Sequence, residues 1–398
     1  MNAYVKRDLY LNRLIVRRDN GQIKAVTGPR RSGKSFLLDP IYKDYLLSKC
    51  VPEDNIIIIS FDIEDEDTPQ ELLDREKLKE YLYSRIASQT ENYYVFLDEI
   101  QEVDGFERIV NGLNKRQNVD VYVTGSNSKF LSTEINTIFR GRSDEVSVLP
   151  FTFREFCQDR QESVNDLWKE YYTYGGLPAL RKMPTAEQKT TYLQKLWKKT
   201  YLDDVVERHN VENREALEAI ADALCSSIGS LTNTTRITNT LGSVRKIKIT
   251  DDTVAKYIGY LEEAFLFNEA RRYNIKGNKY YENIKKYYSI DVGLRNARLN
   301  YRQLEQTHLM ENIIFNELLY RGYVVDVGVV EHRKMVDGKS EYKQYEVDFI
   351  ATDGNEKYYI QSAYEIETEE KREQELNSLK RIDDSFRKIV IVKDDIMT

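Results

Sequence analysis

The stretch that decides the fold is Gly28-Pro29-Arg30-Arg31-Ser32-Gly33-Lys34-Ser35. It matches the pattern G-x-x-x-x-G-K-[ST] in full, between an apolar run, Ile23 to Thr27, and the start of a helical segment. The glycines let backbone N–H groups curl around phosphate oxygens, and a helix start offers them partial positive charge. Lys34 then neutralises the β and γ phosphates, and Ser35 holds Mg²⁺ through its hydroxyl. We expect all eight residues to form a binding loop for ATP with Mg²⁺.

A pair of carboxylates follows a second apolar run. Tyr93 to Leu97 reads as a buried strand that ends in Asp98 and Glu99. Buried parallel strands place such carboxylates at the carboxyl edge of their sheet, beside the phosphate loop. We therefore expect Asp98 to hold Mg²⁺, directly or through water. Glu99 is the expected general base, which polarises the attacking water.

Polar and basic residues follow in the same region. The turn Gly125 to Ser128 comes directly after another apolar strand, and Asn127 or Ser126 is the candidate sensor of the γ phosphate or the water. Arg140 and Arg142 precede a fifth strand. An arginine here stabilises transition-state charge, in its own chain or in a neighbouring subunit. Ordinary surface ion pairing is the alternative for both arginines.

The order of elements predicts an α/β fold. Between residues 22 and 150, short β-rich runs alternate with helical stretches, which indicates crossover connections and a mainly parallel sheet. The expected strands are Ile23–Thr27, Asn55–Phe61, Tyr93–Leu97, Val119–Thr124 and Asp144–Leu149. We expect a P-loop core over residues 1–152. A helical lid follows over residues 153–209, interrupted by the turn Gly175 to Pro178.

Residues 210–300 fit a winged helix. Helical periodicity with small polar breaks is followed by an expected hairpin, Leu266–Tyr273 and Tyr280–Ser289. Lys256 would lie on the recognition helix, and Lys276 and Lys279 on the hairpin would reach DNA phosphates. Winged helices also serve as protein contacts, so both interpretations stay open.

Composition narrows the class of protein. The 398 residues are 41% hydrophobic and 31% charged, which excludes a disordered chain. The net charge of −7 gives no global positive field for nucleic acid. The longest aliphatic run, Ile56 to Ile59, is far shorter than the roughly 18 residues of a membrane span. Three scattered cysteines without metal-ligand spacing indicate a reducing, cytoplasmic setting.

Several motifs together resemble a known family. They are the phosphate loop, Phe96-Leu-Asp-Glu-Ile-Gln, Thr124-Gly-Ser-Asn-Ser, Gly141-Arg-Ser, Leu149-Pro-Phe-Thr-Phe-Arg-Glu-Phe, Gly175-Gly-Leu-Pro-Ala-Leu, Tyr288-Ser-Ile-Asp-Val-Gly-Leu-Arg and Glu311-Asn-Ile-Ile-Phe-Asn-Glu-Leu. This set resembles prokaryotic AAA+ ATPases related to Orc/Cdc6-like and signal-transduction ATPases, over nearly the whole chain. The resemblance implies ATP hydrolysis, DNA binding, a winged helix and a carboxy-terminal domain, residues 301–398, similar to PD-(D/E)xK restriction nucleases.

The nuclease-like domain departs from its pattern. The fold's chemistry needs an Asp on one strand, a Glu or Gln with a Lys on the next, and often a Glu from a helix. Here the candidates are Glu317 on the helix, Asp348 and Gln361. Ala363 stands where the lysine would be, so the group that positions water and stabilises phosphorane charge is missing. We therefore expect this domain to be a remnant of a nuclease that has a binding or structural role. An active metal nuclease is the alternative.

The functional expectation is an ATPase that couples its nucleotide state to the winged-helix and nuclease-like half, acting on DNA. One alternative is a nucleotide-controlled switch that senses a protein partner and has no DNA activity. A second alternative is an ATP-dependent metal nuclease. The expected ligands and partners are ATP, Mg²⁺, DNA, a protein partner and further copies of the same chain, with no membrane.

Overall fold

The computed structural model describes residues 4–62, 69–125, 138–139, 141–336, 339–366 and 368–393, without the side chains of residues 333–336 and 339–341. The chain divides into two compact units. The first unit comprises Met1–Arg160 and Leu177–Ala179, and the second comprises Gln161–Gly176 and Leu180–Thr398.

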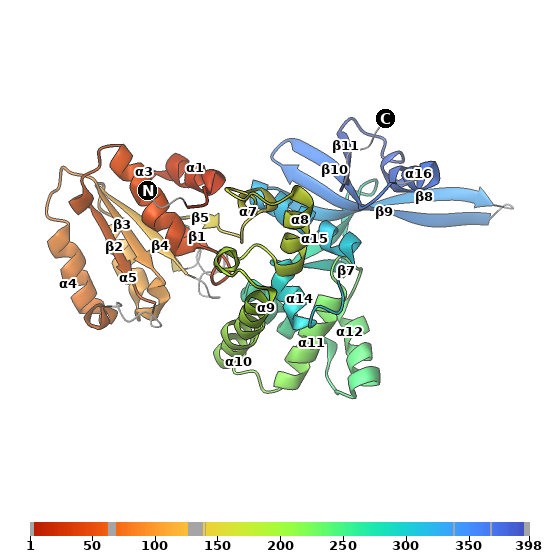
Figure 1. The fold of residues 1–398 in the computed structure, drawn as a ribbon, viewed down its shortest axis with the longest axis horizontal. Coiled ribbons are helices and arrows are strands. Elements are labelled where there is room, and N and C mark those ends of the chain that lie inside the picture. Colours follow the sequence, from red (N-terminus) through yellow and green to blue (C-terminus); the bar gives the residue numbers. More distant parts are fainter. Residues whose placement is uncertain are drawn as a thin grey trace. The chain divides into compact units, whose positions relative to one another are not determined.

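A five-stranded parallel sheet forms the centre of the first unit (Figure 1). Its strands lie in the order β2-β3-β4-β1-β5, and every pairing is parallel. The strands are β1 (Ile23–Thr27), β2 (Ile56–Ser60), β3 (Tyr93–Asp98), β4 (Val119–Thr124) and β5 (Ser143–Ser147). The helical segments are α1 (Asp8–Arg17), α2 (Lys34–Phe36), η1 (Leu37–Tyr42), α3 (Lys43–Ser48), η2 (Glu53–Asn55), η3 (Gln70–Leu73), α4 (Arg75–Arg85), η4 (Ile100–Glu102), α5 (Phe106–Leu113) and α7 (Phe153–Phe156). The predicted α/β class and parallel sheet are confirmed.

Helices cover both faces of this sheet. On one face, α4 and α5 pack against the strands in a buried cluster to which Leu82 and Ile109 contribute. On the other face, the ring of Tyr42 lies 5.8 Å from that of Phe96 and 5.1 Å from that of Tyr122. Strands covered on both sides are continuously apolar, which is why the sequence revealed them. Successive residues of a strand point to opposite faces of the sheet. Side chains at matching positions at the ends of β3 and β4 therefore point to the same face.

The second unit contains a six-stranded mixed sheet. Its order is β11-β10-β9-β8-β6-β7. The strands are β6 (Phe267–Asn274), β7 (Lys279–Ser289), β8 (Val324–Val336), β9 (Lys339–Asp353), β10 (Glu356–Ala363) and β11 (Arg387–Val392). The helical segments are α8 (Val164–Tyr174), α9 (Ala186–Lys195), η7 (Leu196–Leu202), α10 (Asp203–Arg208), α11 (Arg214–Ser226), α12 (Thr234–Thr240), η8 (Leu241–Arg245), α13 (Asp251–Glu263), α14 (Val292–Arg298), α15 (Gln306–Arg321) and α16 (Glu369–Leu379), together with η6 (Pro178–Lys182), which begins in the first unit and ends in the second. Polar side chains cap many of these helices; the caps of α9 and α13, for example, are Thr185 and Thr250.

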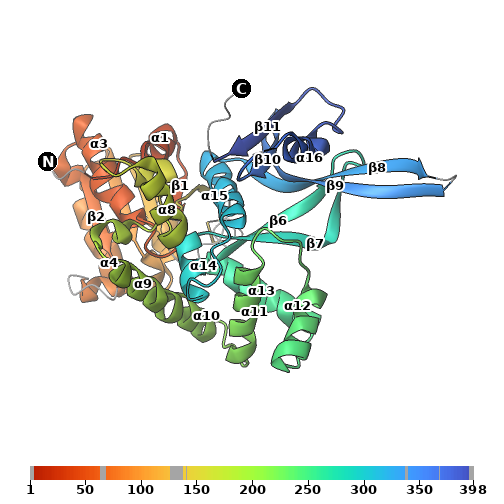
Figure 2. The ribbon, with the colours of Figure 1, turned by 45° about the vertical axis from the view of Figure 1, so that its right-hand side comes forward.

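The predicted hairpin forms, and it belongs to the larger sheet. Strands β6 and β7 pair antiparallel from Phe267↔Ser289 to Asn274↔Lys279. Strand β6 also pairs in parallel with β8, with Arg272 opposite Val327. Figure 2 shows α11, α12 and α13 gathered on one side of this hairpin. The hairpin is therefore fixed along part of its length to the strands that follow it in the chain.

Strands β8 and β9 are much longer than the sequence predicted. The expected runs Tyr323–Val330 and Tyr345–Ala351 continue into a two-stranded arm whose pairing reaches Val336↔Lys339. Figure 1 shows this arm extending away from the rest of the sheet. The predicted boundaries were wrong here because the arm's residues are largely polar, and its pairing depends on backbone hydrogen bonds rather than on an apolar face. Among the described residues, no helix is long and apolar enough to cross a membrane.

Candidate active site

The phosphate loop connects β1 to α2 in a strongly curved backbone. Gly28 and Gly33 have φ angles of 129° and 94°, and Arg31 has a φ of 65°. A Cβ atom on Gly28 would lie 2.2 Å from the carbonyl oxygen of Val148, so no side chain fits there. The loop is closed by a hydrogen bond from the Ser32 N–H to the Pro29 carbonyl, 3.3 Å. Only glycine suits the position of Gly28, as the sequence motif requires.

Lys34 is buried at the start of α2. Its side chain folds back on the loop, and Nζ donates to the carbonyl oxygens of Gly28 (3.1 Å) and Pro29 (3.0 Å). Burial lowers the pKa of Lys34, although the nearby carboxylates of Glu99 and Asp98 act in the opposite direction. The lysine therefore has dipoles rather than charges as direct partners, and a phosphate group would supply the missing negative charge.

Asp98, Ser35 and Thr124 form the centre of the site. The Thr124 hydroxyl donates to Oδ1 of Asp98 (2.5 Å), and the Ser35 side chain also hydrogen-bonds Asp98. Asp98 and Thr124 end β3 and β4 on the same face of the sheet, and β4 lies between β3 and β1. Burial raises the pKa of Asp98 above its ordinary value, while both hydroxyl contacts lower it. The predicted pair Ser35 and Asp98 is thus brought together.

Glu99 is held beside this centre by its backbone and its side chain. Its N–H donates to Oγ1 of Thr124 (2.9 Å), and its Oε2 accepts from Nε2 of Gln101 (2.5 Å). Glu99 has a φ of 51°, which turns the chain sharply after β3. One threonine hydroxyl therefore contacts both members of the predicted carboxylate pair.

The residues of this site fit a nucleotide phosphate with Mg²⁺. Ser32 Oγ is buried and has no hydrogen-bond partner within the described part of the chain. Gly28 and Gly33 leave the backbone open, Lys34 supplies a cation, and Ser35 with Asp98 supplies oxygen ligands of the type that Mg²⁺ prefers. The donor set and the loop thus agree with the ligands that the motif predicted.

Arg7 supports the loop from a segment that carries no recognisable motif. Its Nη1 donates to the Ser32 carbonyl (2.9 Å) and its Nη2 to the Leu149 carbonyl (2.8 Å). Its Nε pairs with Oε1 of Glu155 at 3.2 Å. Arg7 is 3% exposed, so these contacts are shielded from water. The side chain ties the loop to the segments after β5 and at α7.

The turn at Gly175 and Gly176 has a structural cause. A Cβ on Gly175 would lie 2.1 Å from Oδ1 of Asp291, and the Gly176 N–H donates to Oδ2 of Asp291 (2.8 Å). Burial raises the pKa of Asp291 to about 6. The following residues, Leu177–Ala179, belong to the first unit, where Pro178 lies 3.6 Å from the Cβ position of Gly33. The turn, whose Gly176 N–H is bound by Asp291 (the Asp291 clamp), is therefore followed directly by Pro178, a neighbour of the phosphate loop.

The other residues predicted for this site have mixed outcomes. Ser126, Asn127 and Arg140 lie outside the described residues. Arg142 is exposed, and its carbonyl accepts from the Ile23 N–H at 2.8 Å. Thr124 was not predicted as a site residue; the sequence prediction named Asn127 or Ser126 of the turn that follows its strand, β4. Its signal was a buried-strand pattern that ends in a hydroxyl rather than in an apolar residue.

The nuclease-like residues gather in the second unit around a different set than predicted. Asp348 of β9 lies near Lys286 of β7, with 4.0 Å between Oδ1 and Nζ. The helix residue at this cluster is Glu311, whose Oε1 lies 2.9 Å from Lys286 Nζ. The predicted helix residue, Glu317, instead pairs with Arg321 at 2.7 Å, and six residues along a helix place it on another face from Glu311.

Gln361 lies beside Asp348, but its amide is already used within the protein. Its Oε1 accepts from the Asp348 N–H (3.4 Å) and from Ser378 Oγ (3.5 Å), and its Nε2 donates to Glu375 (3.3 Å). Asp348 Oδ2 accepts from the Ser362 N–H (2.8 Å). Ala363 is buried and brings no charge. Gln361 therefore positions backbone and helix rather than offering a free oxygen.

The three lysines predicted to contact DNA are all exposed. Lys256 lies on α13, where its Nζ is 5.7 Å from the ring of Tyr260. Lys276 lies in the turn of the β6–β7 hairpin, and Lys279 begins β7. Their exposure leaves them available to a partner.

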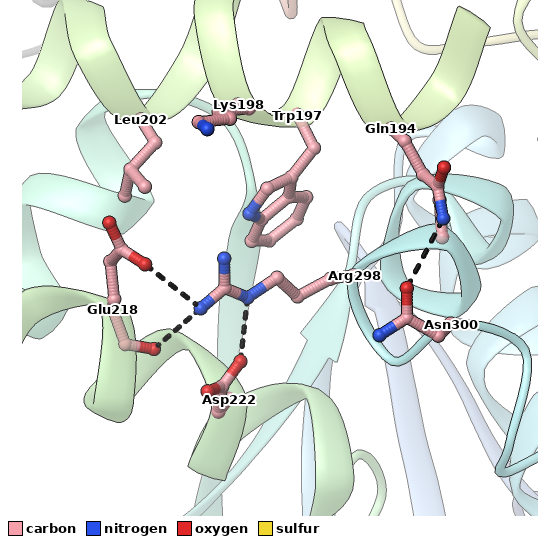
Figure 3. Close-up of a pocket in the computed structure, with 9 residues that line it drawn as sticks. Gln194, Trp197, Lys198, Leu202, Glu218, Asp222, Arg298 and Asn300 are labelled. Carbon is pink, nitrogen blue, oxygen red and sulfur yellow. Dashed lines mark hydrogen bonds and ion pairs between the residues drawn. The ribbon is translucent and has the colours of Figure 1, made fainter. Parts of the chain in front are cut away.

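A pocket of about 480 Å³ lies elsewhere in the second unit (Figure 3). In Figure 3 the guanidinium of Arg298 lies between Glu218 and Asp222, with 2.6 Å from its Nε to Oδ1 of Asp222. Trp197 forms one wall, and its ring centroid is 6.0 Å from the guanidinium carbon. Arg298 of α14 is thus paired with two acidic side chains of α11, and these ion pairs hold α11 and α14 together.

Comparison with known proteins shows which protein family the chain belongs to. Residues 20–157 match a family described as an AAA domain (AAA_14), and residues 165–305 match a domain of unknown function (DUF8612). An uncharacterized protein of Haemophilus influenzae is 34% identical over 394 residues, which cover 98% of this chain and 93% of that protein. The chain belongs to the same family as this uncharacterized protein. The expected AAA+ relationship is thereby confirmed.

Two further comparisons extend this result. The uncharacterized protein MJ1544 of Methanocaldococcus jannaschii is 29% identical over 366 residues, covering 88% of this chain and 77% of that protein. The solved structure of the Walker-type ATPase PABY2304 of Pyrococcus abyssi aligns with a TM-score of 0.52 at 16% identity, covering 74% of this chain and 96% of that one. This likeness shows a shared fold.

Proposed function

We propose that the first unit binds ATP with Mg²⁺ and hydrolyses it. The observation that carries the proposal is the contact of Asp98 with both Ser35 and Thr124, beside a buried lysine that has no carboxylate in direct contact among the described residues. A loop, a hydroxyl and a carboxylate meet here as phosphoryl transfer requires. The bound Mg²⁺ would neutralise phosphate charge.

Each residue then has a role that follows from its contacts. The loop and Lys34 bind the phosphates, and Ser35 and Asp98 hold Mg²⁺. Glu99 accepts a proton from the attacking water, oriented by the Gln101 amide. Thr124 is a positioning residue, because it acts through Asp98 and Glu99. Asn127 as sensor and Arg142 as the arginine that stabilises transition-state charge remain parts of this proposal.

A winged helix within residues 210–300 is the second part of the proposal. It is supported by the order α11, Thr232, α12, α13, β6 and β7, in which Thr232 forms a short antiparallel bridge with Lys285 of β7. Helices followed by a hairpin, with an early short strand joined to it, are the elements of that motif. The parallel pairing of β6 with β8 leaves the hairpin less free than an isolated wing.

We further propose that the nucleotide state of the first unit is coupled to the second unit, which acts on DNA. The chain runs from the Asp291 clamp at Gly176 into Leu177–Ala179 next to Gly33, which offers a covalent route for coupling. Lys256, Lys276 and Lys279 are the proposed phosphate contacts on DNA. The competing function is a switch for a protein partner, and it predicts no salt-sensitive shift of duplex DNA on a gel.

The test is ATP hydrolysis by the wild type, Glu99→Gln and a matched control, Glu102→Gln. Glu102 is an exposed glutamate of the same short segment. Glu99→Gln should keep ATP binding and lose about 10²–10⁴-fold in turnover, because only the proton acceptor is removed. The control should turn over like the wild type. Retained turnover in Glu99→Gln would remove Glu99 from the base role.

The same assay with double-stranded and single-stranded DNA separates the two partners. Stimulation of the wild type by DNA, absent in Glu99→Gln, supports action on DNA. Hydrolysis that depends on Glu99 but is indifferent to DNA favours the switch for a protein partner.

A further inference from the structure

The side chain of Lys286 fills the centre of the acidic cluster in the second unit. Its Nζ lies 2.7 Å from Oε1 of Glu346, 2.9 Å from Oε1 of Glu311 and 4.0 Å from Oδ1 of Asp348. Lys286 comes from β7, whereas its partners come from β9 and α15. The side chain is only 4% exposed, so the ammonium is enclosed by these groups.

Several other atoms of the cluster also form hydrogen bonds. Glu311 Oε1 accepts a second hydrogen bond from the Tyr288 hydroxyl (2.6 Å). Asp348 Oδ2 accepts from the Ser362 N–H (2.8 Å), and the Gln361 amide contacts Asp348, Ser378 and Glu375. Within the described part of the chain, no group of His, Cys, Asp and Glu residues is arranged to hold a metal ion. Each of the three carboxylates thus contacts at least one donor of the protein itself.

These contacts do not fit the metal that the nuclease resemblance implies. A divalent cation requires oxygen ligands at about 2.0–2.6 Å. The Lys286 ammonium contacts the Glu311 and Glu346 oxygens directly and occupies the space between them. Its positive charge would also repel a second cation in this buried place. Gln361 offers no free oxygen, and Ala363 supplies no ammonium to activate water.

We propose that this acidic cluster is a cation site whose permanent occupant is the Lys286 ammonium of the same chain. The second unit consequently binds no divalent cation at Asp348 and does not cleave phosphodiesters there. The role of the cluster is to join β7 to α15 and β9, so that the hairpin after the proposed recognition helix is fixed to the rest of the sheet. This inference is independent of ATP hydrolysis in the first unit.

The test measures Mn²⁺ binding to the full chain without nucleotide, by electron paramagnetic resonance of the free ion. The variants are Lys286→Met, Asp348→Asn, their combination, and Lys285→Met as control. Lys285 is the adjacent lysine, half-exposed and paired with Glu269 at 2.5 Å. Wild type, Asp348→Asn and Lys285→Met should bind Mn²⁺ equally. Lys286→Met should gain a site that binds about tenfold tighter than any in the wild type, and the double variant should lose it.

Two results would overturn the proposal. One is a wild-type Mn²⁺ site, or Mn²⁺-dependent cleavage of DNA, that disappears in Asp348→Asn. The other is a folded Lys286→Met protein, checked by circular dichroism, that gains no Mn²⁺ site. If Lys286→Met does not fold, the comparison of wild type with Asp348→Asn decides alone, since both keep the lysine in place.

Discussion

Lys34 in the first unit and Lys286 in the second are both buried near carboxylates, and their pKa values move in opposite directions. Lys34 and Lys286 are 4% and 3% exposed, so burial costs both of them a similar loss of hydration. Burial lowers the pKa of Lys34. The carboxylates of Glu311, Glu346 and Asp348 outweigh burial and raise the pKa of Lys286.

The difference lies in the direct partners. Lys34 Nζ contacts the carbonyl oxygens of Gly28 and Pro29, and the influence of Asp98 and Glu99 is too weak to reverse the shift. Lys286 contacts carboxylate oxygens at 2.7 and 2.9 Å. A lysine that binds an anionic ligand must not have its charge already compensated by carboxylates of the protein. A lysine with a structural role has its charge compensated by direct carboxylate contacts. The two sites show the same residue type prepared for opposite uses.

The largest expected effect comes from replacing Lys286, whose charge is compensated by direct carboxylate contacts. Lys286→Met should lower the free energy of unfolding of the second unit by about 3–5 kcal/mol, because buried carboxylates are left without their cation. Both tryptophans, Trp168 and Trp197, belong to this unit, so tryptophan fluorescence during urea unfolding reports on it. The half-exposed Lys285→Met should change stability by less than about 1 kcal/mol. Equal losses in the two variants would show that the enclosed ion pairs are no stronger than surface ones.

A smaller effect on stability, with a large effect on binding, is expected at the other lysine. Lys34→Met should weaken ATP binding about 100-fold or more, equivalent to about 2.7 kcal/mol, while unfolding changes by less than about 1 kcal/mol. Isothermal titration calorimetry measures the first quantity and scanning calorimetry the second.

Lys43→Met is the matched control in the same unit, since Lys43 pairs with the exposed Glu53 at 2.9 Å. It should bind ATP like the wild type. A Lys34→Met protein that binds ATP normally would contradict the assignment of the loop, and one that unfolds readily would remove the contrast with Lys286.

Much of the first unit was predictable from the sequence because its signals are local. Strand β3 is buried along its whole length, so its apolar run stood out, and the loop motif Gly28–Ser35 fixed the neighbouring helix start. Thr124 was missed because its role depends on the sheet order, in which β4 separates β1 from β3. Arg7 was missed because its contacts reach residues as far along the chain as Glu155.

The second unit was harder because its key contacts link distant segments. Lys286 meets Glu311 and Glu346, which no spacing or periodicity connects with it. Helical periodicity also gave no means to choose between Glu311 and Glu317 until the packing of α15 was known. The sequence alone shows that Ala363 stands where the usual lysine would be. The lysine that enters the cluster from β7 could be identified only from the structure.

The smallest expected effect concerns the pH dependence of the second site. Burial and the Glu311 carboxylate raise the pKa of Asp348 to about 7, against the influence of Lys286, and Glu346 also acts to raise it. The unfolded chain releases this proton near pH 3.9. Between these pH values the folded state binds more protons, so stability falls as the pH rises from about 4 to 7.

Asp348→Asn should therefore flatten the decline in stability between about pH 4 and 7, with a change of about 1.5 kcal/mol near pH 5, because there the carboxyl is protonated in the folded state and already ionised in the unfolded chain. Urea midpoints followed by tryptophan fluorescence at several pH values measure the slope. The same substitution leaves Lys34 and its site untouched, so ATP binding should be unaffected. An unchanged slope in Asp348→Asn would mean that Lys286 compensates Asp348 fully. The difference between the two sites would then be that Lys34 has no carboxylate in direct contact among the described residues, whereas the carboxylates around Lys286 all remain ionised.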